Sequence, residues 1–173
     1  MKKDPFVYVT YIRTTPEKLW RALIEPEFTR KFWVNTTQES EWKPGASWRI
    51  KAPGDLITDS GEVLEIEPPR RLVLKWRNEF RPELKAEGYS RLTYQLEKEG
   101  KSVKLTVIHE IEKEGSKFIQ AVSTGWPHIL ASLKSLLEPA NHWKKPANGR
   151  VKRVNSGFGK SQSDSLFSPA FGR

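Results

Sequence analysis

The sequence predicts an α+β fold in which an antiparallel β-sheet packs against one long C-terminal helix. Two patterns indicate this. Apolar and polar residues alternate in successive short segments between residues 48 and 110, which is typical of half-buried strands joined as hairpins. After Gly115, apolar residues instead recur every three or four positions, as in an amphipathic helix. A sheet with one apolar face and a helix with one apolar stripe are expected to bury those surfaces against each other.

The first predicted elements are a strand and two short helices. Residues 6–12, FVYVTYI, are rich in the aromatic and β-branched side chains that favour a strand. Thr15 then precedes Pro16, which is typical of a helix start, because Thr caps free N–H groups and Pro suits the first helical turn. Pro26 ends this first helix. Its apolar stripe consists of Leu19, Trp20, Leu23 and Ile24, and the second short helix supplies Phe28, Phe32 and Trp33.

Alternating patterns predict five further strands. They cover residues 48–51, 61–67, 72–77, 91–96 and 103–110. The segment EFRPELKAEG at residues 79–88 is predicted to be a loop, because Pro82 and Gly88 interrupt a polar run.

The predicted long helix begins after Gly115 and ends at Pro139. Pro127 lies inside it, and because proline lacks an N–H and clashes with the preceding turn, we expect a kink or a broken first segment there. Residues 1–140 are therefore predicted to form one domain. Residues 141–173 are rich in Gly, Ser, Asn and Lys without a sustained apolar period, which predicts a basic, disordered C-terminal tail.

The net charge of +9 is unevenly distributed along the chain. Seven Lys or Arg residues and a single acidic residue, Asp164, follow Pro139, so the domain itself is only mildly basic. Its charge consequently indicates little about partners. The basic clusters of the tail lie near Trp143 and Phe158, a combination that suggests non-specific rather than specific contact with nucleic acid.

Composition also restricts the cellular setting and the chemistry. No apolar run approaches the roughly 18–20 residues that span a membrane, and the N-terminus lacks the apolar segment of a secretory signal. The absence of cysteine excludes disulfides, thiol catalysis and thiolate metal sites. The sequence thus favours a cytoplasmic protein without a membrane span.

Catalytic signatures are missing. The chain contains no H-E-x-x-H, G-x-S-x-G, Walker A or G-x-G-x-x-G motif. Its three histidines are too scattered to indicate a metal site. The sequence therefore predicts no metal, no cofactor and no assigned catalytic residue, while leaving enzyme activity open.

The order of elements, taken with three segments, resembles a known superfamily. The segments are TTPEKLWRALIEPE near the start, GEVLEIEPPRRLVLKW in the middle and GWPHILASLKSLLE near the end. Over roughly residues 5–138 the chain resembles the SRPBCC superfamily (START-like, Bet v 1-like), and within it the group related to the activator of the heat-shock protein 90 ATPase. The resemblance implies a helix-grip fold, a curved antiparallel sheet wrapped around the C-terminal helix with a cavity between them. Because the superfamily includes lipid carriers, hormone receptors, cyclases and co-chaperones, the fold does not select a function.

The expected cavity would be lined by residues in the apolar register of the strands and the long helix. The predicted ligand-binding residues are Trp33, Trp48, Trp76, Tyr94, Val107, His109, Phe118, Val122 and Trp126. Ligand pockets are usually apolar, with a few polar groups that orient the ligand. The alternative is that these side chains fill one another's space as an ordinary core.

His109 is the best single polar candidate, because it shares the apolar register of Leu105 and Val107 on its strand. Tyr94 shares the same face on the neighbouring strand, so a ligand carbonyl or carboxylate could meet both side chains. The alternative is a buried histidine satisfied by a backbone group or by Tyr94. His128, next to the apolar stripe, is expected to point partly outward.

Three functions remain open at this point. The leading expectation is that the protein binds a hydrophobic or amphipathic small molecule, as a carrier or sensor. The resemblance implies the first alternative, a co-chaperone of the stress response that contacts a heat-shock chaperone. The second alternative is a cyclase-like enzyme in which His109 and Tyr94 supply acid–base groups.

Overall fold

The computed structural model describes residues 5–138 of the 173-residue chain. The predicted C-terminal tail therefore lies outside the described residues. The elements follow one another as β1 (Phe6–Ile12), α1 (Pro16–Ile24), α2 (Pro26–Phe32), β2 (Thr37–Ser40), β3 (Ser47–Ala52), β4 (Leu56–Glu67), β5 (Arg71–Asn78), α3 (Pro82–Lys85), β6 (Ser90–Glu99), β7 (Ser102–Glu110) and α4 (Lys117–Leu137).

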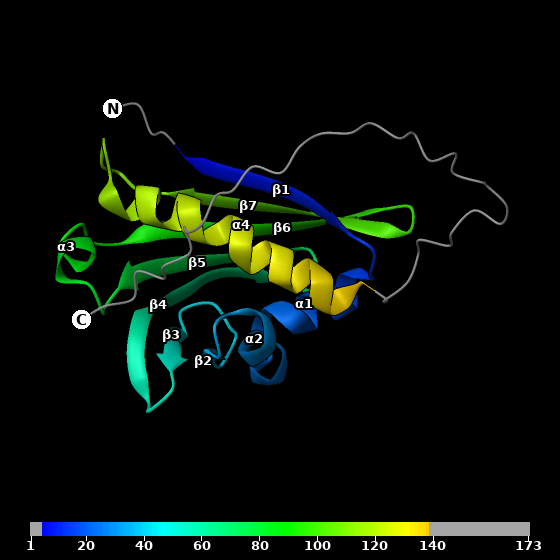
Figure 1. The fold of residues 1–173 in the computed structure, drawn as a ribbon, viewed down its shortest axis with the longest axis horizontal. Helices are drawn as coiled ribbons and strands as arrows, with labels where there is room; N and C mark the ends of the chain where they lie inside the picture. Colours follow the sequence, from blue (N-terminus) through cyan, green and yellow to red (C-terminus); the bar gives the residue numbers. More distant parts are fainter. Residues whose placement is uncertain (1–4, 139–173) are drawn as a thin grey trace, which may run out of the picture. The chain divides into compact units, whose positions relative to one another are not determined.

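The strands form a single antiparallel sheet in the order β1-β7-β6-β5-β4-β3-β2. Helix α4 crosses one face of this sheet, and α1 and α2 lie near the end of the sheet that holds β2 and β3 (Figure 1). The predicted α+β, helix-grip arrangement is confirmed. Among the described residues, no helix combines the length and the hydropathy that crossing a bilayer requires.

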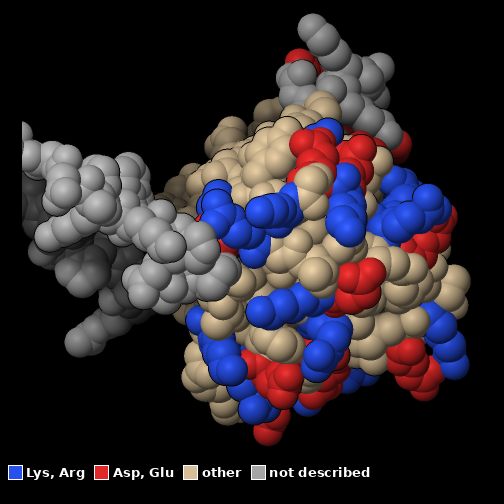
Figure 2. Space-filling view, turned by 90° about the vertical axis from the view of Figure 1, so that its right-hand side faces the viewer, with Lys and Arg blue, Asp and Glu red and all other residues tan. Residues whose placement is uncertain are grey.

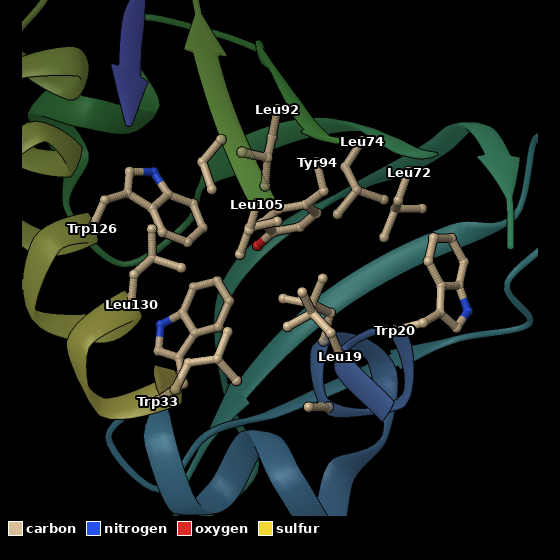
Figure 3. Packing of buried hydrophobic residues seen from close by; sticks show 14 of the residues in the cluster. Leu19, Trp20, Trp33, Leu72, Leu74, Leu92, Tyr94, Leu105, Trp126 and Leu130 are labelled. Atoms are coloured by element: carbon tan, nitrogen blue, oxygen red, sulfur yellow. The ribbon is translucent and has the colours of Figure 1, made fainter. Parts of the chain in front are cut away.

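The predicted register of the sheet is correct. Along β7, buried residues alternate with half-buried ones, and His109 is fully buried in phase with Leu105 and Val107. The neighbouring strands contribute Trp48, Leu74, Trp76, Leu92 and Tyr94 to the same buried set. Figure 3 shows several of these side chains packed between the sheet and the helices. Aromatic and aliphatic groups fill most of this interior.

Helix α1 begins as the sequence predicted. The Thr15 hydroxyl accepts a hydrogen bond from the backbone N–H of Lys18 at 3.3 Å, and Pro16 occupies the first turn. Most of the apolar stripe of α1 is buried, with Leu19 and Leu23 almost inaccessible to solvent and Ile24 partly buried. Helix α2 then carries Phe32 and the adjoining Trp33 into the core beside α4.

Strand β2 was not predicted, because its sequence TQES is polar throughout. Only Gln38 of this strand is buried, and it is held by two hydrogen bonds. Its Nε2 donates to the Leu23 carbonyl at 2.8 Å, and its Oε1 accepts from the Trp48 indole at 2.9 Å. The strand is thus fixed by one inward amide rather than by an apolar pattern.

Two further expectations are corrected. The predicted loop at residues 79–88 contains the short helix α3, whose Leu84 is buried. The broken first segment that was one of the two outcomes expected at Pro127 does not occur, since α4 is continuous from Lys117 to Leu137, while a kink there stays a prediction. A proline removes only one backbone hydrogen bond, and the packing of Trp126 and Leu130 on either side, both buried, holds the helix together.

The N-terminus of α4 is capped from a distant part of the chain. The Glu87 carboxylate accepts hydrogen bonds from the Ser116 hydroxyl at 2.6 Å and from the backbone N–H groups of Lys117 and Phe118, both at 3.1 Å. Burial alone would raise the pKa of Glu87, but these bonds outweigh burial and lower the pKa to about 2. A negative charge is also favoured at a helix N-terminus, so Glu87 stabilises the start of α4 together with the N-cap residue Ser116, whose hydroxyl accepts from the Ile119 N–H at 3.1 Å.

Candidate functional site

A groove with a volume of about 230 Å³ opens between α4 and the strands β4 and β5. Most of its walls are apolar. The lining consists of Trp33, Asp59, Trp76, Asn78, Arg81, Leu84, Phe118, Ala121, Val122, Gly125, Trp126 and Ile129. Larger hollows, of about 520 and 600 Å³, lie elsewhere on the surface, but their walls are mostly polar or charged side chains. The groove at α4 is therefore the best candidate for an apolar ligand.

Four aromatic rings form the inner end of the groove. Trp33 lies between α2 and α4, with its ring centroid 5.3 Å from that of Trp126 and 5.9 Å from that of Trp76. Trp76 also lies 6.5 Å from Phe118. Separations of this kind are favourable for tilted and edge-to-face aromatic pairs. The rings support one another, so they present a preformed apolar surface to the groove.

Asp59 supplies a carboxylate to the same groove, and its residue is only 8% exposed. Its Oδ1 accepts hydrogen bonds from the Trp76 indole at 2.8 Å and from the Asn78 amide at 3.0 Å. Burial raises the pKa of Asp59, although hydrogen bonds from Trp76, Thr58 and Asn78 act against that rise. The groove thus combines aromatic walls with one buried acidic group.

Gly125 keeps the α4 side of the groove open. It lies in the helix interior and lines the groove, and a Cβ added there would meet no heavy atom within 4 Å. Glycine destabilises a helix interior by about 1 kcal/mol relative to alanine. A larger side chain at this position would project into the groove. Glycine therefore leaves the groove open here, although it makes the helix less stable than alanine would.

His109 lies behind the groove in a complete hydrogen-bond network. The Trp126 indole lies 3.2 Å from His109 Nδ1, and the Ser90 hydroxyl lies 2.8 Å from His109 Nε2. Because an indole N–H can only donate, Nδ1 accepts and the ring proton resides on Nε2, which donates to Ser90. Ser90 in turn donates to the Trp76 carbonyl at 3.1 Å. Burial lowers the pKa of His109 to about 3, so the ring is neutral.

The Tyr94 hydroxyl differs from His109 in having no hydrogen-bond partner among the described residues. The residue is 1% exposed, and burial raises the pKa of its phenol. In Figure 3 its oxygen lies on the side of the ring that faces Trp33, Trp126 and Leu130. A buried hydroxyl without a partner costs about 1–3 kcal/mol of folding free energy.

Replacing Tyr94 with phenylalanine should therefore leave the free energy of unfolding unchanged or raise it by about 1 kcal/mol, because the variant removes a desolvated, unbonded hydroxyl. Chemical denaturation would measure the difference. The matched control is Ser90→Ala, which removes a buried hydroxyl that is bonded on both sides and should destabilise by about 1–3 kcal/mol. A comparable loss in Tyr94→Phe would show that the phenol has a partner.

The structure divides the predicted ligand-binding residues into two groups. Those that line the groove are Trp33, Trp76, Phe118, Val122 and Trp126. Those that lie behind it in the filled core are Trp48, Tyr94, Val107 and His109. The hydrogen bonds of His109 go to Trp126 and Ser90 rather than to a backbone group or Tyr94, and joint contact of His109 and Tyr94 with a ligand stays a prediction. His128 is exposed, as expected.

Sequence reasoning missed the polar side of the groove. Asp59 lies in the part of β4 that precedes the predicted strand 61–67, Asn78 is the last residue of β5, and Arg81 lies in the segment that was predicted to be a loop. No apolar period singles out these three residues in the sequence. Among residues 5–138, no group of three or more His, Cys, Asp or Glu side chains could hold a metal ion.

The fold is that of an SRPBCC-type helix-grip protein. A curved sheet packs against a long C-terminal helix, and two short helices follow the first strand. A family model described as "Activator of Hsp90 ATPase homolog 1-like protein" matches residues 13–138. The chain belongs to this family, as the resemblance in its sequence indicated. No curated protein matches the chain significantly.

Solved structures share the fold. A Mesorhizobium loti protein is 24% identical, with a TM-score of 0.66 over 77% of this chain and 96% of its own. The Aha1 dimer from Colwellia psychrerythraea is 19% identical, with a TM-score of 0.61 over 78% of this chain and 96% of its own. An HSP90 activator from Plasmodium falciparum is also 19% identical, with a TM-score of 0.62 over 77% of this chain and 95% of its own. At these identities the likeness concerns the fold.

Proposed function

We propose that this protein binds a small, largely apolar molecule in the groove between α4 and the strands β4 and β5. The observation that carries the proposal is the aromatic lining formed by Trp33, Trp76, Phe118 and Trp126 around a hollow that also contains the buried carboxylate of Asp59. Ligand sites typically combine mostly apolar walls with one or a few placed polar groups.

The dimensions of the groove limit the ligand. Its volume of about 230 Å³ is below the roughly 300–1,000 Å³ of typical drug-sized sites. The interior behind it is filled by side chains such as Trp48, Tyr94 and Leu105, all at most 1% exposed. The proposed ligand is therefore about the size of one or two fused rings, and the protein is better suited to such a molecule than to a long-chain lipid.

Gly125 offers a direct test. Gly125→Leu should fill the groove and abolish binding of small aromatic probes such as indole, naphthalene and N,N,N-trimethylanilinium, measured by tryptophan fluorescence and by NMR shifts of groove residues. Gly125→Ala is the matched control: it should keep binding and stabilise α4 by up to about 1 kcal/mol. The proposal fails if no probe perturbs the groove of the wild-type protein, or if Gly125→Leu binds probes as well as Gly125→Ala does.

Family membership favours a second candidate, contact with a heat-shock protein 90 chaperone. The matching family is described as activator-like, and the similar Plasmodium falciparum protein is an HSP90 activator. Adding this protein to purified chaperone should then raise the ATPase rate. No stimulation at micromolar excess would argue against this function. A groove-filled Gly125→Leu variant that still stimulates would separate chaperone contact from ligand binding.

Acid–base catalysis by His109 and Tyr94 gains no support from the geometry. Both ring nitrogens of His109 are engaged in hydrogen bonds, and burial lowers the pKa of the ring to about 3. A general base near neutral pH needs a pKa close to the working pH and access to the substrate. His109 has neither property, since it is 0% exposed.

A further inference from the structure

We infer that the ligand of the groove is an organic cation, an ammonium group carried on a small apolar body. The inference rests on the proposed function of the groove and names the chemical class that it recognises. It depends on the surroundings of Asp59, on the walls of the groove and on the position of Arg81.

Asp59 is a buried carboxylate whose hydrogen-bond donors are neutral. The Trp76 indole and the Asn78 amide both reach the same oxygen, Oδ1, and Thr58 contributes a further hydrogen bond. The charge of Glu79, which also acts on Asp59, is negative and so cannot balance it. Within residues 5–138, no Lys, Arg or His nitrogen lies within 4.0 Å of this carboxylate. Charges buried in proteins are almost always paired, because desolvation of an isolated ion is strongly unfavourable. The described part of the chain therefore supplies no positive charge to balance Asp59.

Other shielded carboxylates of this domain are paired. Glu79 forms ion pairs with Arg77 and Lys85, both at 2.7 Å. Burial alone would raise the pKa of Glu79, but hydrogen bonds from Lys85, Ser60 and Arg77 outweigh burial and lower the pKa to about 2. Asp59 shows the opposite direction, since burial and the negative charge of Glu79 raise its pKa despite its hydrogen bonds. Glu79 has positive partners within the fold and Asp59 has none. We therefore expect the ligand to supply the positive group beside Asp59.

The walls of the groove suit an ammonium group as well as an apolar body. Trp33, Trp76, Trp126 and Phe118 line the same hollow as Asp59. A cation within about 6 Å of an aromatic face is attracted by the negative face of the ring, and the attraction grows when the cation is desolvated. Aromatic walls around one carboxylate therefore favour a weakly hydrated organic cation over a strongly hydrated metal ion.

Arg81 also lines the groove, but its charge is offset locally. Its guanidinium bonds Glu83 at 2.8 Å, and its backbone N–H donates to the Asn78 side chain at 2.8 Å. The side chain is about half exposed, so it belongs to the rim rather than to the buried end beside Asp59. It leaves the carboxylate as the unbalanced charge of the groove. Charges elsewhere are mixed, as the end of the domain in Figure 2 shows, where blue and red side chains alternate.

A pair of probes with the same shape tests the inference. N,N,N-trimethylanilinium and tert-butylbenzene differ in one central atom, nitrogen or carbon, and hence in one positive charge. The wild-type protein should bind the cation at least about tenfold more tightly, which corresponds to about 1.4 kcal/mol. Asp59→Asn should abolish this preference, because the amide keeps an oxygen that accepts from Trp76 and Asn78 but removes the charge. Thermal unfolding would check that the variant folds, and if it does not, the wild-type comparison decides alone.

The outcomes separate the two proposals. Equal or tighter binding of tert-butylbenzene by the wild-type protein would overturn the cation inference and leave the groove as an apolar site. A cation preference that survives in Asp59→Asn would overturn the role of Asp59. If neither probe binds, both the inference and the proposed function are wrong. If the wild-type protein prefers the cation and Gly125→Leu binds neither probe, the results would support both the proposed function and the cation inference.

Discussion

Replacing Gly61 with alanine should destabilise the domain by at least about 3 kcal/mol. Most point mutations cost about 0.5–3 kcal/mol, and larger losses have an identifiable structural cause. Gly61 lies in β4, opposite Trp48 on one side and Trp76 on the other. An added Cβ would lie 1.7 Å from the carbonyl oxygen of Lys75, which is a backbone atom. Since backbone in the middle of a sheet cannot move aside like a flexible side chain, β4 and β5 would have to separate.

The consequences should extend to the groove. The rings of Trp48 and Trp76 approach to 4.9 Å between centroids across Gly61, and Trp76 holds Asp59 by its indole N–H. Separating β4 from β5 would displace both Trp76 and Asp59, so probe binding should weaken together with stability. Urea denaturation and the probe titration would measure the two effects on the same preparation.

The same substitution at Gly125 is the control. There the added methyl meets open space within a helix, so Gly125→Ala should stabilise the domain by up to about 1 kcal/mol. The two variants differ only in position and are expected to have opposite signs. Equal stability of Gly61→Ala and the wild type would contradict the close approach of β4 and β5.

The register of the sheet could be predicted because alternation is a local property. A strand buried on one face repeats with a period of two, so the inward positions of Trp76, Tyr94 and His109 follow directly from their neighbours in sequence. The helical stripe of α4 is equally local. Strand β2 escaped prediction because its one inward group, Gln38, is polar and is stabilised by Leu23 and Trp48, which are distant in sequence.

The candidate site was predictable only in part, because it depends on contacts between elements. Trp33 and Trp126 were expected at the cavity, and they meet there because α2 and α4 pack together. Nothing in the sequence indicates that Trp126 donates to His109 or that Ser90 occupies its other nitrogen. These bonds engage both ring nitrogens of His109, whereas Asp59 is the buried acidic group that lines the groove.

Acidification should reveal this structural role of His109. Burial lowers its pKa from the ordinary 6.5 to about 3. Above pH 6.5 the ring is neutral in both the folded and the unfolded chain and has no effect on the pH dependence. Below pH 6.5 the unfolded chain binds a proton that the folded chain excludes until the pH approaches 3. The free energy of unfolding should therefore fall with decreasing pH, by up to about 1.4 kcal/mol per unit.

The window between pH 6.5 and 4.5 is the informative one. Glu79 and Glu87 have pKa values lowered from 4.5 to about 2, so the stability that they contribute is present above 4.5 and is lost only at lower pH. Asp59 has a raised pKa, which has the opposite sign, because its protonation favours the folded chain as the pH falls. Denaturation curves across this window should show a loss of about 2 kcal/mol in the wild-type protein.

Two variants assign that slope to its source. His109→Gln should flatten the profile between pH 6.5 and 4.5, whatever its effect on absolute stability, because an amide does not titrate there. Asp59→Asn should make the profile steeper, because it removes the contribution of opposite sign.

If His109→Gln keeps the wild-type slope, the ring accepts its proton within the fold. In that case Nδ1 cannot be held as an acceptor by Trp126, and the network that separates His109 from the groove would be wrong. The pH profile therefore tests the same hydrogen bonds that argue against acid–base chemistry by His109.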